Sequence, residues 1–213
     1  WSYPEISGVI ADLVKEHYRY MPYIYNCGIE SSQNGTPMER PLALEFSNDA
    51  RVDFEDFNFM FGDSILVVAP VKESEESFPV YLPAGEEWIE PVQQQLFQGG
   101  RHIEVDYPLE GIRYFVKAGS VVPVTDHDGT LFHAFFERLI FKLYPKPAVT
   151  TEYHYFEDDG DSDFSEGSYN EWLIRMSCEG PQEFTLSIEL LQSAFEAEQP
   201  AQRIFEFELP QGF

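Results

Sequence analysis

Beyond Gly35, short apolar runs alternate with clusters of Pro, Gly, Asn and Asp, and no further long stretch has helical periodicity. Runs of roughly four to eight residues between such breakers are typical of β-strands. In "HIEVDY", Ile103, Val105 and Tyr107 would share one face of a strand. Strands at this spacing without helices between them predict antiparallel β-sandwiches. The expected strands are 40–46, 64–71, 78–83, 102–107, 113–119, 120–124, 132–145, 151–157, 171–178, 183–190 and 203–209.

Only residues 5–33 have the pattern of a long amphipathic helix. Pro22 lacks a backbone donor and predicts a break or kink in it. Asn34 and Gly35 supply a stop signal at its end. The apolar side chains recur mostly at steps of three or four residues, and they are Ile6, Val9, Ile10, Leu13, Val14, Tyr18 and Met21.

The polar segment "TDHDG" (125–129) separates two sets of expected strands and predicts a domain boundary. The expected fold class is therefore mainly β, with two antiparallel β-sandwich domains after an N-terminal helix. We expect a helical segment at 1–35, a proximal sandwich at 36–125 and a distal sandwich at 126–213.

The charge of the chain excludes two classes of partner. With 38 acidic and 13 basic residues, the formal net charge is −25. Nucleic acids and anionic membranes bind clustered Lys and Arg, and the sequence has no such cluster. The longest apolar runs, such as 64–71, are far shorter than the ~20 residues that span a bilayer. We therefore expect no nucleic-acid partner and no transmembrane segment.

The cysteines and histidines do not form a recognisable metal motif. Cys27 and Cys178 lie far apart, and two lone thiols favour a reducing, cytoplasmic location. In "HDGTLFH", His127, Asp128 and His133 are spaced too widely across a turn to clamp an ion well. We expect no metal and no cofactor. The sequence begins with Trp rather than Met, which suggests a part of a longer polypeptide.

The most acidic stretch of the chain is "YFEDDGDSDFSEGSYNEW" (155–172). An EF-hand loop that began at Asp159 would need Gly where Phe164 stands, and flanking helices are missing. Adjacent Asp158 and Asp159 would point to opposite faces of a strand, which argues against a catalytic pair. Glycine, Asp and Ser between two strand-like runs favour a β-hairpin with an acidic loop, and weak calcium binding is the alternative.

Four segments resemble glycoside hydrolase family 31, in the same order and at similar spacing. "RYMPYIYNCGIESSQNGTPMERPLALEF" resembles the family's "RYxLLPYLYxLxxEAxxxGxPVxRPLxxEF", and "FMFGDSILVVAPV" resembles its "QFMxGxxLLVAPV". "GGRHIEVDYPLEGIRYFVKAGSVVPV" is similar to "GGxxixVxaPLdxiPvFVraGsiiP", and "YFEDDGDSDFSEGSY" is similar to the "YeDDGxsxxYexGxy" hairpin. Arg113 departs from the pattern, which has Pro there, and the likeness weakens beyond Cys178.

The resemblance implies the C-terminal portion of an enzyme that hydrolyses α-glycosidic bonds with retention of configuration. In such enzymes a (β/α)8 barrel carries the two catalytic Asp residues, and both would lie upstream of the matched segments. Residues 1–35 are similar to the last helix of that barrel. The implied partners are the upstream barrel and an α-glucoside or α-xyloside oligosaccharide. No catalytic residue and no cofactor is expected in this chain, which alone should be inactive.

Trp88 and Trp172 are the candidate carbohydrate contacts, because indole rings can stack on sugar rings. Core packing is the alternative for both. The rival function is a stand-alone carbohydrate-binding module that uses these two side chains. The helix at 5–33 argues against that rival, because its apolar face would be exposed unless a barrel covered it.

Overall fold

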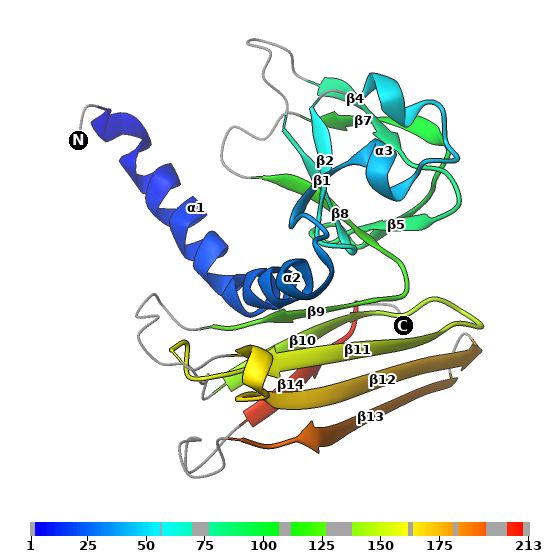
Figure 1. The fold of residues 1–213 in the computed structure, drawn as a ribbon. Coiled ribbons are helices and arrows are strands. Elements are labelled where there is room, and N and C mark those ends of the chain that lie inside the picture. The colour runs from blue at the N-terminus through cyan, green and yellow to red at the C-terminus, as the bar shows by residue number, and fades with distance from the viewer. Residues whose placement is uncertain are drawn as a thin grey trace.

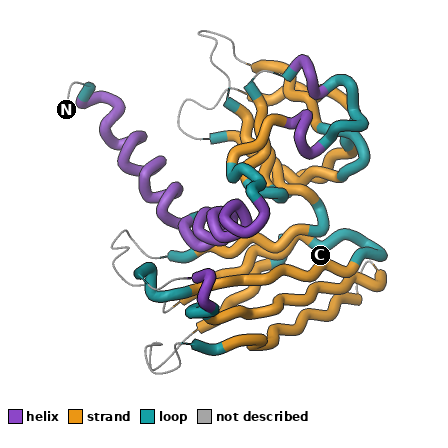
Figure 2. The backbone as a smooth tube through the Cα atoms, in the orientation of Figure 1, coloured by secondary structure: helices purple, strands orange, loops and turns teal. Residues whose placement is uncertain are grey.

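The structure is a computed structural model, and it is mainly β with two helices at the N-terminus (Figures 1 and 2). The residues that it describes are 3–55, 57–69, 77–106, 112–126, 138–161, 164–180, 183–194 and 204–210.

The predicted N-terminal helix is two helices, α1 (Ser7–Arg19) and α2 (Met21–Asn34), after a short 3-10 turn η1 (Pro4–Ile6). Tyr20 separates them, and Pro22 lies in the first turn of α2, where its missing N–H is tolerated. Gly35 ends α2 in the left-handed conformation, with φ of 77°. The break near Pro22 and the stop at Gly35 are confirmed.

The proximal part contains a six-stranded antiparallel sheet in the order β1-β2-β3-β8-β5-β6 and a two-stranded antiparallel sheet of β4 and β7. A helical turn α3 (Leu42–Glu45) and a 3-10 turn η2 (Val52–Phe54) connect β1 to β2. The strands are β1 (Glu39–Pro41), β2 (Asn58–Phe61), β3 (Ile65–Val68), β4 (Ser77–Leu82), β5 (Glu87–Glu90), β6 (Gln95–Gln98), β7 (Arg101–Asp106) and β8 (Arg113–Lys117).

The distal part contains two three-stranded sheets, in the orders β9-β10-β14 and β11-β12-β13. All of their pairs are antiparallel except β10 with β14, which run parallel. A 3-10 turn η3 (Phe164–Glu166) lies between β11 and β12. The strands are β9 (Ser120–Val124), β10 (Arg138–Tyr144), β11 (Thr150–Glu157), β12 (Asn170–Gly180), β13 (Glu183–Gln192) and β14 (Ile204–Glu208). Strand β9 thus pairs with β10 across the segment where the sequence predicts a boundary.

Three cores hold the molecule together, and alternate residues of the central strands point into different cores. One core lies between the two proximal sheets and contains Trp88, while the neighbouring Ile89 points into the core around α2. In β10, Leu139 belongs to the core between the distal sheets and Ile140 to the core around α2. These strands are buried on both faces, which explains why apolar residues stand next to each other in them, as at 88–89 and 139–141. Helix α2 therefore lies between the proximal and distal parts, as Figure 1 shows.

The prediction of a strand over 40–46 is wrong in its second half. Only β1 is extended, and Leu42–Glu45 forms one helical turn, with Leu42 buried. The helical turn places the Glu45 carboxylate 2.5 Å from the Arg40 guanidinium. The Glu30 carboxylate lies 2.8 Å from the same guanidinium. The buried Arg40 needs these two carboxylates to neutralise its charge. Bringing Glu45 to Arg40 therefore favours the helical turn over the extended conformation that the residue pattern predicts. Strands β2, β5 and β6 were not predicted.

Candidate docking face and acidic hairpin

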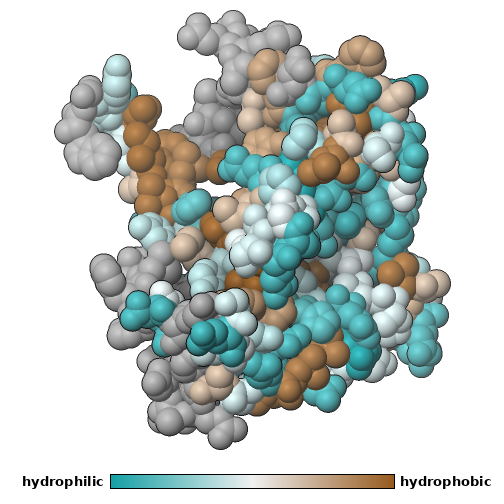
Figure 3. All heavy atoms as spheres, viewed as in Figure 1, coloured by the Kyte–Doolittle hydropathy of each residue, from teal (hydrophilic) through white to brown (hydrophobic). Residues whose placement is uncertain are grey.

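Helix α1 and the 3-10 turn before it carry an exposed apolar stripe of Ile6, Ile10 and Val14, spaced four residues apart on the same face. Their exposed fractions are 44%, 37% and 48%, and no residue of α1 is buried. Figure 1 shows α1 extending away from both β parts, and Figure 3 shows the brown apolar side chains along it. A stripe of this kind is typical of a helix that packs against another surface.

A groove of about 220 Å³ continues the apolar surface at the junction of α1 and α2. Its far wall is the outer face of the six-stranded sheet. Tyr20 and Tyr114 close one side, with their hydroxyl oxygens 2.7 Å apart. Burial raises the pKa of both phenols, so they stay neutral in the folded protein. The lining residues are Glu16, His17, Tyr20, Ile24, Glu39, Phe59, Phe61, Ile65, Val67, Ile112 and Tyr114.

Helix α2, in contrast, is anchored to the proximal sheet. The buried Tyr23 donates a hydrogen bond to the Phe61 carbonyl oxygen at 2.8 Å, and the Ser64 amide donates to its hydroxyl at 3.3 Å. Gly62 has φ of 60°, and a Cβ there would lie 2.2 Å from the Tyr23 hydroxyl. Only glycine therefore permits this close approach of helix and strand.

Helix α2 is also anchored to the distal sheet, through the side chain of Asn26. Its amide nitrogen donates to the Phe156 carbonyl oxygen at 3.1 Å, and the Phe156 amide donates to its oxygen at 2.7 Å. The pair of bonds imitates a strand neighbour at the edge of β11. Asn26 is 7% exposed, so losing either bond would leave a buried polar group without a partner.

The acidic stretch forms the predicted hairpin. Strands β11 and β12 are antiparallel, with Glu157 opposite Asn170 at the last pair before the loop. Glu157 is 2% exposed, and its carboxylate accepts hydrogen bonds from the Asn170 amide at 3.4 Å and the Trp172 indole at 3.3 Å. This carboxylate therefore stabilises the base of the loop.

Asp158 connects the hairpin to α2. It is 4% exposed, and its two oxygens accept the Tyr25 hydroxyl at 2.6 and 2.7 Å. The Gly160 amide donates to the same carboxylate at 2.8 Å. Burial, and then the hydrogen bond with Asp158, raise the pKa of Tyr25, so this donor stays protonated. The sequence predicted the hairpin but not this contact, because residues 25 and 158 belong to segments far apart in the chain.

The two candidate tryptophans have structural contacts. Trp88 is fully buried in the core between the proximal sheets, and its indole donates to the Pro83 carbonyl oxygen at 3.1 Å. It has no exposed face for a sugar ring. Trp172 is half-buried and packs edge-on against Phe205, with ring centroids 4.9 Å apart. The structure does not bring the two side chains together, because they belong to different cores.

Other sequence expectations concern thiols, metals and membranes. Cys27 and Cys178 are free and buried, and burial raises the pKa of the Cys27 thiol to about 12. His127, Asp128 and His133 lie outside the described residues. Among the residues described, no group of three His, Cys, Asp or Glu side chains is arranged to hold a metal ion. The described helices are all too short or too polar to cross a membrane.

Comparisons with known proteins agree with this architecture. Residues 35–122 match the family model described as Glycosyl hydrolase family 31 C-terminal domain. An α-xylosidase of Saccharolobus solfataricus is 28% identical over 189 residues, which cover 87% of this chain and 25% of that protein. A glucose-bound dextranase of Flavobacterium johnsoniae has a TM-score of 0.84 at 26% identity, covering 96% of this chain and 25% of the other.

The fold and these matches define the chain as the β-rich C-terminal region of a large glycosidase family. Residues 35–122 correspond to the C-terminal domain of glycoside hydrolase family 31, and most of the chain is similar in sequence or fold to the α-xylosidase and the dextranase named above. The chain spans a quarter or less of the length of these relatives, as it does for a probable glucan 1,3-α-glucosidase of Arabidopsis thaliana, 32% identical over 118 residues. That match covers 55% of this chain and 13% of the plant protein.

Proposed function

We propose that this chain is the C-terminal part of a retaining glycoside hydrolase that acts on α-glucoside or α-xyloside oligosaccharides. The family assignment supports this activity, as do the α-xylosidase, glucan 1,3-α-glucosidase and dextranase named above. Retaining hydrolysis uses two carboxyl groups about 5–5.5 Å apart. The buried carboxylates Glu157 and Asp158 are engaged as hydrogen-bond acceptors within the fold. We therefore assign catalysis to an upstream (β/α)8 barrel and expect none from this chain alone.

The proposed role of the chain is to support that barrel, with 1–35 as its last helical segment, 36–125 as the proximal sandwich and 126–213 as the distal one, while β9 at the end of the proximal range pairs with β10 of the distal range. The observation that carries this role is the apolar stripe of Ile6, Ile10 and Val14, which no described part of the chain covers. A barrel packed on α1 would bury these side chains, each worth up to ~1.5–3 kcal/mol when fully buried. The two free cysteines support a cytoplasmic location.

A substitution in the stripe tests the role in the full-length protein that contains this chain. Ile10→Lys would place a charge in the proposed interface, and we expect kcat/KM for an α-glucoside or α-xyloside to fall at least tenfold. Proteolysis between barrel and sandwiches should become faster. Asp12→Lys is the matched control, because Asp12 lies on the same helix with its side chain 79% exposed. Equal activity in the two variants would refute the docking of α1 on the barrel.

The inactivity of the isolated chain is tested separately. The purified 213 residues should release no product from α-glucosides or α-xylosides at enzyme concentrations that give complete turnover with the full-length protein. Hydrolysis by the chain alone would place a catalytic pair within it and refute the upstream location of catalysis.

A further inference from the structure

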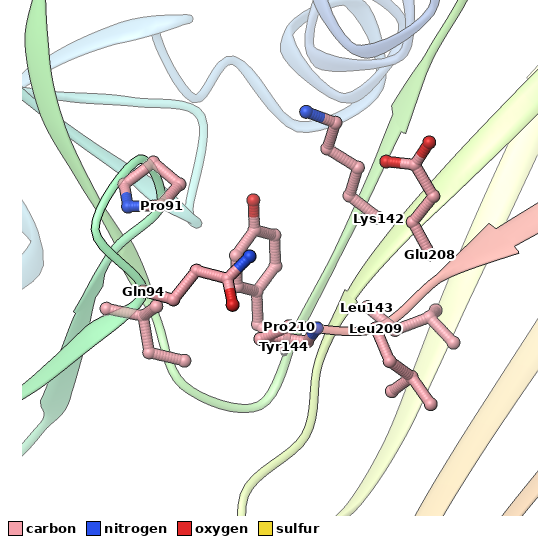
Figure 4. Close-up of a pocket in the computed structure, with 9 residues that line it drawn as sticks. Pro91, Gln94, Lys142, Leu143, Tyr144, Glu208, Leu209 and Pro210 are labelled. Atoms are coloured by element: carbon pink, nitrogen blue, oxygen red, sulfur yellow. The ribbon is translucent and has the colours of Figure 1, made fainter. Parts of the chain in front are cut away.

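A second pocket, of about 80 Å³, lies at the seam between the proximal and distal parts (Figure 4). Its proximal wall is the turn between β5 and β6, and its distal wall is formed by β10 and the end of β14. The turn holds Gln94 in the left-handed conformation, with φ of 55°, which is uncommon for a residue other than glycine. The lining residues are Ile89, Pro91, Gln94, Lys142, Leu143, Tyr144, Glu208, Leu209 and Pro210.

Two polar groups face this pocket without a partner in the described structure. Tyr144 is only 5% exposed, and its hydroxyl makes no hydrogen bond to any described residue. Lys142 is half-buried, and its ammonium group likewise has no hydrogen bond or ion pair within that part of the chain. Figure 4 shows both side chains extending the same way, alongside the Glu208 carboxylate. Among the described residues, Arg113 Nε is the one buried side-chain polar atom without a partner, so the Tyr144 hydroxyl and the Lys142 ammonium reach the open pocket and are available to water or a ligand.

The chemistry of the lining selects a class of ligand. Lys142 donates, Glu208 accepts, and the Tyr144 hydroxyl does both. Lys142 and Glu208 are direct neighbours in the parallel register of β10 and β14, so both charges face the same ligand. A compact anion would be repelled by Glu208 and by the net charge of −25. A neutral polyol avoids that repulsion, and Pro91 and Leu209 offer apolar surface for its C–H groups.

We propose that this pocket binds one hydroxyl-bearing edge of a sugar. The volume has room for roughly two to three water-sized groups, which fits adjacent hydroxyl groups rather than a whole oligosaccharide. The rest of the sugar extends from the open side. Lys142 and Tyr144 bind the hydroxyl groups, and Gln94 and Glu208 fix their orientation. The site does not depend on a barrel or on hydrolysis.

An NMR titration of the full chain with glucose and with maltotriose tests the site. We expect saturable chemical-shift changes at the Gln94 side-chain amide and in the backbone of β10 and β14. Lys142→Met keeps the side-chain stem and should weaken binding about tenfold, and Tyr144→Phe should weaken it several-fold. Lys146→Met is the matched control, because Lys146 pairs with Glu86 at 3.1 Å outside the pocket, and it should bind as the unmodified chain does.

Three results would overturn the proposal: no saturable change with either sugar, unchanged binding in both pocket variants, or saturation by acetate or phosphate in place of the sugars. Circular dichroism spectra of each variant establish that it is folded before the titration. Because the titration measures no hydrolysis, a failed sugar site leaves the proposed barrel support intact, and a failed docking of α1 leaves the sugar site intact.

Discussion

Helices α1 and α2 are adjacent in the chain and similar in sequence pattern, yet their surroundings differ completely. Helix α2 buries five residues and makes side-chain hydrogen bonds to both the proximal and the distal sheets. Helix α1 buries none. The expectation that the apolar face of the whole helix at 5–33 would be exposed is therefore wrong for α2 and holds only for α1. Amphipathicity shows that a helix has an apolar face, but not whether its own chain covers that face.

The largest difference in unfolding free energy is expected from substituting two glycines. Gly62 packs against Tyr23 of α2, and Gly8 lies in α1. Gly62→Ala would force a Cβ to within 2.2 Å of the Tyr23 hydroxyl at φ of 60°, and we expect it to lower the free energy of unfolding by about 2–4 kcal/mol. Gly8→Ala, in α1, meets no atom within 4 Å and should be neutral or stabilising by up to about 1 kcal/mol. Urea denaturation of both variants gives the values. Similar losses in the two would contradict the tight packing of α2.

A smaller effect is expected where the hairpin holds α2. Asp158→Ala removes the acceptor for Tyr25 and the Gly160 amide, and should cost about 2 kcal/mol of unfolding free energy. Asp161→Ala, in the exposed part of the same loop, is the control and should change stability by less than about 0.5 kcal/mol. If Asp161→Ala cost as much as Asp158→Ala, the acidic loop would act through its overall charge instead.

The buried tyrosines predict a loss of stability at alkaline pH. Their pKa values are raised in the folded protein, so above pH 10 the unfolded chain releases phenol protons that the folded chain retains. Their contribution is therefore complete below pH 10 and is lost as the pH rises through the folded pKa values. We expect Tyr20→Phe to reduce the fall in unfolding free energy between pH 9 and pH 11, measured by denaturation at each pH. An identical pH profile in this variant would exclude Tyr20 as a contributor.

The smallest effect is expected on α1. In the isolated chain, Ile10→Lys should change the unfolding free energy by less than about 0.5 kcal/mol, because Ile10 packs against little else. The solubility of the chain should rise, since the apolar stripe is interrupted. Concentration-dependent light scattering measures this. A marked loss of stability would mean that α1 packs on the sandwiches in solution.

These contrasts also show how far the sequence could be interpreted. The acidic hairpin, the break near Pro22 and nearly all of the long strands follow from local signals: turn residues, a missing donor and alternating apolar residues. The helical turn at Leu42–Glu45 was missed because its cause is the burial of Arg40 between two carboxylates, one of them in α2. The partners of Asp158 and the surroundings of Tyr144 are equally non-local. Trp172, proposed as a carbohydrate contact, keeps that role only as a prediction.

The sequence by itself determined that this chain is mainly β, where its helices and hairpin lie, and which family it resembles. Those features depend on the conformational preferences of neighbouring residues and on motifs that survive in one chain. Only the tertiary structure decided that α2 joins two β parts while α1 exposes its apolar face. It also decided that Asp158 binds Tyr25, and that Lys142 and Tyr144 face one pocket. The reason is physical: alternation places a side chain on one face of a strand or helix, but the partner on that face comes from a distant segment.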